Sequence, residues 1–295
     1  MMRPVLLFVV CSSIALGQGT SSGSSYLKLP IHARAAATGE AFVVDSSAFA
    51  SVSLNPANAF TDASTEVFFS HSQWIQDVRA DAVGALVPTP YGAFGFMILN
   101  TGVNGIEIRD VPGPPLGTFS SHSSVFQVLY ANVVTSDVTV GANLKYLYEK
   151  IFVDEASGYG IDIGATYRTP VEGLSVGASL TNLGTVSAFR SEKNDLPNRV
   201  QLGGTYAFNA ADLEWRVAGS WMNDLKRSEN RLLFGGEVSY ANNFSFRLGY
   251  QTGYENRGFS TGTGVQYSFV KLDYAYVPFS LGFGNAHVLS VGFEL

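Results

Sequence analysis

The residues that most often catalyse reactions or bind metals are few in this chain. Its four histidines are His32, His71, His122 and His287, and no pair of them has the His-x-x-x-His spacing, or a similar spacing, that holds zinc. The only cysteine is Cys11. The sequence therefore predicts no metal site and no bound cofactor.

One histidine lies next to possible nucleophiles. His122 is flanked by Ser120, Ser121, Ser123 and Ser124, a cluster that would suit a lipase or a protease. Such enzymes need a third group that orients the histidine, and the sequence offers none at this position. We therefore expect an ordinary Ser-rich connection here and no enzyme.

Several stretches of the sequence alternate between apolar and polar side chains, with a period of two residues. From Val138 to Tyr148, the set Val, Val, Ala, Leu, Tyr, Tyr alternates with the set Thr, Gly, Asn, Lys, Leu. The alternation recurs from Tyr159 to Arg168 and from Leu174 to Thr181. Only a β-strand places the two sets on opposite faces. Because the polar set has few charges, we expect it to face a lumen and the apolar set to face lipid, unlike the faces of a soluble sandwich.

The composition favours a membrane location. Apolar residues make up 46% of the 295 residues and charged residues only 14%, whereas about a quarter of residues are charged in an average soluble protein. No segment after the N-terminal region approaches the roughly 20 apolar residues of a spanning helix. A closed β-barrel is the other structure that satisfies its backbone in lipid. The net charge of −6 predicts no binding to nucleic acid.

The segments with a period of two predict a transmembrane antiparallel β-barrel. We count about fourteen strands between residues 64 and 295, and counts of twelve or sixteen also fit because no clear turn residue marks the break near Val270. The connections after even-numbered strands are short, and those after odd-numbered strands are longer, above all Thr101 to His122 and Leu183 to Asn198. Periplasmic turns and extracellular loops of an outer-membrane barrel alternate in this way.

The N-terminal region differs from the strands. Residues 1–17 combine a basic start, an apolar stretch and small residues, which is typical of a signal peptide cleaved near Gly17/Gln18. Residues 18–63 are a lead-in and a segment rich in small side chains, which we expect to plug the periplasmic side of the lumen; a disordered tail is the alternative. Residues 64–295 would form the barrel, in the outer membrane of a bacterial cell.

The polar face of the predicted strands carries charges of both signs. A ring of one sign would select ions, whereas mixed signs around a plug favour mutual pairing. We expect such side chains to face the lumen and to pair there. The residues that we single out are Lys145, Asp162, Arg168, Arg216, Arg247 and Asp273.

Several motifs resemble, in order, those of the PorV/PorQ family of outer-membrane proteins. The N-terminal ones are Leu27-Lys28-Leu29-Pro30, Ala33-Arg34-Ala35-Ala36, Gly39-Glu40-Ala41-Phe42 and Asn55-Pro56-Ala57. We assign the plug and family motif to Pro30, Arg34, Gly39, Phe42, Asn55, Pro56 and Ala57. The chain departs from the family pattern at His32, at Ser46-Ser47 and at Asn58, so a ligand role of the family's acidic positions does not carry over.

The resemblance implies a FadL-like barrel of fourteen strands with an N-terminal plug. It also implies a role in type IX protein secretion, as an accessory component or as a receiver of cargo. The partners would then be outer-membrane lipid and secretion-system proteins or cargo C-terminal domains. The alternative function is a FadL-like channel for uptake of small hydrophobic molecules. That channel would have an apolar pocket, which Phe42, Val43, Val44 and Leu54 could line.

Overall fold

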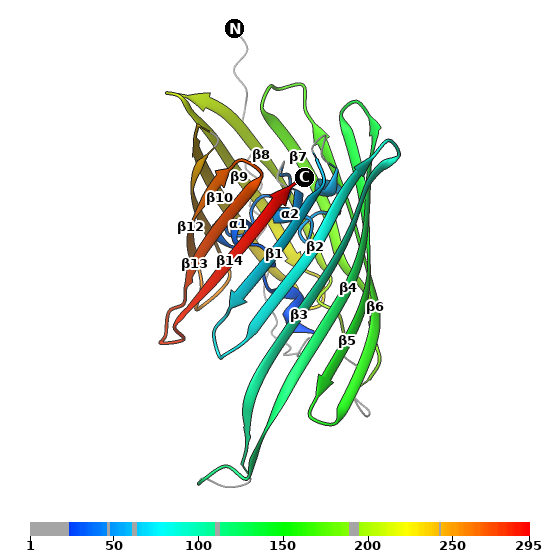
Figure 1. The fold of residues 1–295 in the computed structure, drawn as a ribbon, viewed down its shortest axis with the longest axis vertical. Coiled ribbons are helices and arrows are strands. Elements are labelled where there is room, and N and C mark those ends of the chain that lie inside the picture. Colours follow the sequence, from blue (N-terminus) through cyan, green and yellow to red (C-terminus); the bar gives the residue numbers. More distant parts are fainter. Residues whose placement is uncertain (1–23, 46–47, 61–63, 110–112, 189–194, 242) are drawn as a thin grey trace.

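A computed structural model shows the arrangement of the chain (Figure 1). It describes residues 24–45, 48–60, 64–109, 113–188, 195–241 and 243–295. The predicted signal peptide, residues 1–17, lies outside the described residues. No helix among the described residues is long and apolar enough to cross a membrane.

Fourteen antiparallel strands form a closed barrel, in which β1 pairs with β14. The predicted fold and the count of fourteen are thus confirmed. Val270 opens a strand of its own because Ser268, with a φ of 53°, allows a two-residue turn before it. The strands are β1 (Glu66–Gln73), β2 (Arg79–Thr89), β3 (Gly92–Ile108), β4 (Gly117–Thr135), β5 (Val138–Ile151), β6 (Asp154–Arg168), β7 (Leu174–Val186), β8 (Arg199–Ala210), β9 (Leu213–Asp224), β10 (Glu229–Tyr240), β11 (Phe244–Gln251), β12 (Phe259–Tyr267), β13 (Val270–Pro278) and β14 (Asn285–Glu294).

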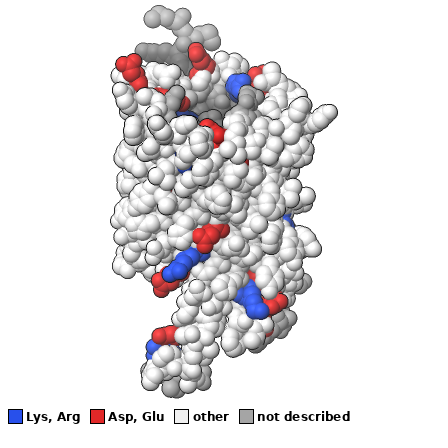
Figure 2. Space-filling model, viewed as in Figure 1, with Lys and Arg blue, Asp and Glu red and all other residues white. Residues whose placement is uncertain are grey.

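The outer surface of the barrel is apolar. On β6, Tyr159, Ile161 and Ile163 are 68%, 44% and 47% exposed, whereas Asp162 between them is fully buried. Figure 2 shows a broad uncharged band over the wall, with Lys, Arg, Asp and Glu gathered above and below it. The apolar parity of the strands therefore faces outward, as the sequence pattern predicts, and suits contact with lipid.

Aromatic side chains line the outer surface near both ends of the strands. Near the short turns, the ring of Phe208 stacks between those of Tyr206 and Trp215, with ring centroids 5.5 and 6.3 Å away. Near the long connections, Tyr146 and Tyr159 have ring centroids 5.4 Å apart. Rings with an apolar body and a polar edge occupy the two headgroup levels of outer-membrane barrels.

The longest predicted connection is largely strand, so the prediction of a loop from Thr101 to His122 is wrong. Strands β3 and β4 continue as a two-stranded ribbon well beyond the rest of the rim (Figure 1), with Ile106 opposite Phe119. The pairing shifts register between Val103 and Ile106 and continues beyond that point. It ends before Pro114, which has no backbone N–H to donate.

The second predicted loop, Leu183 to Asn198, also differs from the expectation. Strand β7 extends to Val186, and Leu196 is 1% exposed because it packs into an apolar cluster inside the barrel. Residues 189–194 lie outside the described residues.

The N-terminal residues form short helices within the barrel (Figure 1). They are η1 (Ser25–Lys28), α1 (Ala33–Ala37), α2 (Ala48–Ser51) and η2 (Pro56–Ala59). Helix α1 contacts β11, β12, β13 and β14, and η2 contacts β3, β4, β5 and β6. Gly39, with a φ of 60°, follows the end of α1.

Candidate functional site

We define the inner segment as the described residues between 24 and 60. Near the long connections, Tyr26 donates a hydrogen bond of 2.9 Å to Glu149, and Lys28 Nζ lies 2.6 Å from Asp224 Oδ2. Burial lowers the pKa of the Lys28 ammonium, and its ion pair with Asp224 opposes that shift. The inner segment ends with η2 near the short turns of β4, β5 and β6. It thus runs from one end of the lumen to the other, farther than the periplasmic side alone.

Glycines of the wall let the inner segment approach closely. A Cβ at Gly164 of β6 would lie 2.0 Å from Asn55 Oδ1, and a Cβ at Gly249 of β11 would lie 2.2 Å from the backbone nitrogen of Gly39. Asn55 uses this closeness: its Nδ2 donates to the carbonyl of Ala165 at 3.2 Å. Any larger residue at either wall position would displace the segment.

Buried ion pairs join the inner segment to one side of the wall. Arg34 Nη2 lies 2.8 Å from Glu237 Oε1 and 3.2 Å from Asp45 Oδ1. Arg216 of β9 reaches the same Asp45 oxygen at 2.9 Å. All four residues are less than a tenth exposed, so removal of one of them would leave the remaining desolvated charges less fully compensated.

The same ion-pair network continues along the wall. Arg247 of β11 bonds to Glu237 through Nε and lies 2.6 Å from Asp273 Oδ1 through Nη1. The structure therefore brings together Arg216, Arg247 and Asp273 among the residues singled out from the sequence.

The other singled-out charges lie elsewhere. Lys145 Nζ and Asp162 Oδ2 form a separate pair of 2.7 Å on the opposite side of the lumen, and Lys145 also donates to Asn182. Asn143 donates to the same carboxylate at 2.9 Å. Arg168 is exposed at the rim near the short turns, where it lines a large cavity.

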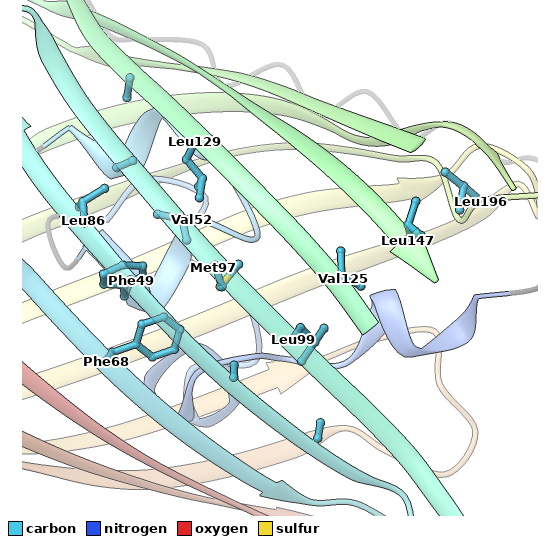
Figure 3. Close-up of a cluster of buried hydrophobic side chains, with 14 of the residues drawn as sticks. Phe49, Val52, Phe68, Leu86, Met97, Leu99, Val125, Leu129, Leu147 and Leu196 are labelled. Carbon is cyan, nitrogen blue, oxygen red and sulfur yellow. The ribbon is translucent and has the colours of Figure 1, made fainter. Parts of the chain in front are cut away.

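A cluster of buried apolar side chains lies mainly on the inner face of β1 to β4, and Leu147 of β5 joins it. Figure 3 shows Phe49 and Val52 of the inner segment beside side chains of these strands, and the rings of Phe49 and Phe68 have centroids 4.3 Å apart. We call this cluster the apolar sector. Its largest members are Phe49, Val52, Phe68, Leu86, Met97, Leu99, Val125, Leu129, Leu147 and Leu196. The lumen thus has a largely apolar sector beside β1 to β4 and its main ion-pair network beside β9 to β13.

The sequence motif residues all belong to the inner segment, in different surroundings. Pro30 and Gly39 border a small gap beneath the long connections, and the Gly39 carbonyl accepts a hydrogen bond of 2.7 Å from Gln251. Phe42 packs with Met222 and Leu233, apart from the apolar sector. Arg34 is the ion-pair anchor, and Asn55, Pro56 and Ala57 form the start of η2 against the wall.

The apolar pocket expected around Phe42, Val43, Val44 and Leu54 is not formed by these residues together. Phe42 belongs to a separate cluster, and Val44 borders a large cavity near the short turns. Phe49 and Val52 of the inner segment pack into the apolar sector instead, and neither residue was predicted to do so. Glu40 and Asp45 are further functional residues that were not predicted, although their sequence signal is clear, since they are the only charged residues from 39 to 60.

Three cavities open near the short turns. The largest, about 1040 Å³, is lined by residues that include Asp45, Phe60, Arg168 and Glu214. A cavity of about 390 Å³ borders the ion-pair network, and one of about 670 Å³ lies at the rim beside Asp212. The gap under the long connections is only about 10 Å³. Within the part of the chain that the structure describes, these cavities thus lie toward the short turns, and the gap under the long connections is much smaller.

His32, His71 and His287 make separate contacts in different parts of the barrel. His32 caps α1 by accepting a hydrogen bond of 3.1 Å from the Arg34 backbone N–H, whereas His71 pairs with Asp81 on the outer surface. His287 bonds to Tyr274, also outside. Among the described residues, no group of three His, Cys, Asp or Glu side chains could hold a metal ion.

Comparison with known proteins finds similarity in structure and none in sequence. No family model matches the chain, and no curated protein matches it. The solved structures that it resembles include the CymD monoaromatic hydrocarbon channel, with a TM-score of 0.58 at 12% identity over 82% of this chain and 91% of that one. A Pseudomonas aeruginosa FadL homologue gives 0.57 at 11% over 90% and 98%. The P. putida toluene transporter TodX gives 0.54 at 12% over 82% and 92%.

The chain has the fold of the FadL-like barrels. At 11 to 12% identity the likeness establishes the fold alone. It agrees with an outer-membrane location and with the FadL-like part of the resemblance noted above. No finding supports the PorV/PorQ family itself or its role in type IX secretion, because no family model matches this FadL-like barrel.

Proposed function

We propose that this chain is a non-enzymatic outer-membrane channel for small hydrophobic molecules. In this proposal residues 1–17 are the cleaved signal peptide, residues 18–63 the lead-in and plug, and residues 64–295 the barrel. The observation that carries the proposal is the apolar sector. A water-filled pore has a polar interior, whereas an apolar molecule gains about 25 cal/mol for each Å² that it removes from water. The names of the similar structures, hydrocarbon channels and a toluene transporter, support the same function.

The apolar sector crosses the lumen lengthwise. Leu147 and Leu196 lie toward the long connections, and Leu86 and Leu129 lie toward the short turns, with Met97 between them (Figure 3). A hydrophobic molecule that followed this side would stay in contact with apolar side chains along its way.

The apolar and the charged contacts of the inner segment differ in how easily a hydrophobic ligand could replace them. Separation of Phe49 from Phe68 exposes apolar surface, which a hydrophobic ligand would cover again. Separation of Arg34 from Glu237 would break a buried ion pair, a loss that no such ligand could compensate. We therefore expect the inner segment to stay anchored on its charged side while molecules pass on its apolar side.

The test is uptake by cells whose own FadL-type channels have been deleted. Expression of this chain should raise the initial rate of accumulation of a labelled monoaromatic hydrocarbon. Met97→Gln, in the apolar sector, should lower that rate several-fold, because a buried amide without partners disfavours apolar contact. Phe96→Gln on the outward face of the same strand is the matched control and should leave the rate unchanged.

Accumulation no faster than in cells without the chain, at equal levels of folded barrel, would disprove the channel. Deletion of the gene in its own host, followed by proteomics of the cell surface and the medium, addresses protein export. Broad loss of secreted proteins would then favour the export role that the sequence resemblance implies.

A further inference from the structure

The connection between β11 and β12, residues 252–258, closes over the inner segment near the long connections. Arg257 Nη2 lies 3.4 Å from Glu40 Oε2, and the two side chains are 8% and 5% exposed. Arg257 also donates to Gln251, the last residue of β11. A loop at the mouth of the barrel thus contacts a carboxylate inside it.

Two aromatic rings lie against this arginine, one from its own connection and one from the connection between β1 and β2. Its guanidinium lies 5.5 Å from the ring centroid of Trp74, between β1 and β2, and 4.5 Å from that of Tyr254. Trp74 in turn packs edge-on against Phe279, after β13, with centroids 5.6 Å apart. Two connections therefore meet at the Arg257 side chain, a third supports Trp74 from behind, and cation–π contacts fix the position of the guanidinium.

Glu40 is itself held in an unfavourable backbone conformation. Its φ is 56°, in the left-handed region, directly after Gly39 at 60°. Gln251 and Gln201 of the wall donate hydrogen bonds of 2.7 and 2.8 Å to the carbonyls of Gly39 and Glu40. A residue other than glycine keeps such a conformation only where its surroundings impose it. The chain reverses at this point, between α1 and the stretch that ends at Asp45.

We propose that the contact between Arg257 and Glu40 is a latch through which the long connections hold the inner segment docked. Movement of residues 252–258 away from the mouth removes the cation from Glu40. The carboxylate is then buried without a charged partner, and the strained turn at Gly39 and Glu40 is free to relax. Undocking therefore begins at the long connections. This proposal does not depend on which molecule crosses the barrel.

A thiol reporter tests the latch directly. The chain has one cysteine, Cys11, so Cys11→Ser with Val43→Cys gives a single thiol. Val43 is 0% exposed and lies three residues after Glu40, and cysteine is smaller than valine. The rate of reaction with a bulky, water-soluble maleimide, measured on the folded full chain in detergent micelles, then reports undocking of the inner segment.

Arg257→Ala should raise the labelling rate at least about ten-fold, since it removes one partner of a buried charge pair. Arg257→Lys should give a smaller increase, because lysine keeps the charge but lacks the planar group that stacks on the rings. Adding Glu40→Gln to Arg257→Ala should return the rate toward that of the parent. Lys226→Ala, which breaks an exposed pair with Asp195 in another long connection, is the matched control and should have no effect.

The gel-mobility shift on heating shows that each variant forms a folded barrel. If folded Arg257→Ala protein labels at the parent's rate, the latch does not exist. If Lys226→Ala accelerates labelling as much as Arg257→Ala does, a general loosening of the loops replaces the latch. Neither outcome depends on hydrocarbon uptake, so failure of the latch is distinguishable from failure of the channel.

Discussion

Arg34 in α1 and Glu237 in β10 are 203 residues apart in the chain, and 2.8 Å separates Nη2 of the one from Oε1 of the other. Both are buried, and both share their network with Asp45 and Arg216. The inner segment is therefore fixed to one side of the wall by charge, while its other side rests on the apolar sector. The predictions below follow from this asymmetry.

Arg34→Ala should favour undocking of the inner segment by about 3 to 5 kcal/mol, because Glu237 and Asp45 lose a buried cation. The measurement is the rate of proteolytic cleavage within residues 24–60 of the folded barrel. Arg109→Ala, which removes an exposed pair with Glu107, should leave that rate unchanged. Equal cleavage rates in the parent and in Arg34→Ala would mean that the ion pair does not anchor the segment.

Gly164→Ala should displace η2 from the wall, because the added Cβ would lie 2.0 Å from Asn55 Oδ1. Gly219→Ala is the matched control, since nothing lies within 4 Å of a Cβ built at Gly219. Cleavage near Asn55 should accelerate in the first variant only. The same response in both variants would point to a general effect of removing glycine from strands.

Phe49→Ala should open the apolar sector. Loss of a fully packed phenylalanine costs about 3 to 5 kcal/mol of packing, and the space left beside Phe68 lies on the proposed path. The initial rate of hydrocarbon accumulation should rise. Phe69→Ala, on the outward face of the same strand as Phe68, is the control. A fall in the rate at normal levels of folded protein would place the path elsewhere.

Deletion of residues 26–60 tests the plug. The lumen of the shortened chain would lose the side chains that fill it, so single-channel conductance in planar bilayers should increase. The full chain, reconstituted under the same conditions, is the reference. A shortened protein that folds but conducts no better would show that the inner segment does not block the lumen.

The wall of the barrel could be predicted from the sequence because alternation is a local property. Tyr159, Ile161 and Ile163 against Asp162 already separate an outer from an inner face, whatever strands lie beside them. The prediction failed between Thr101 and His122, where a run of prolines and a glycine suggested a long loop. There, pairing between two partner strands decided the outcome, as between Ile106 and Phe119.

The sequence by itself determined the barrel and the inward direction of residues such as Arg247 and Asp273, whereas the count of fourteen strands was fixed only by the structure. Only the tertiary structure decided which of the inward residues meet, because closure of the barrel and the path of the inner segment bring together positions remote in the chain. Arg34 with Glu237 and Phe49 with Phe68 are such pairs. Their partners depend on register and on the course of a segment through the lumen, and a pattern that repeats every two residues contains neither.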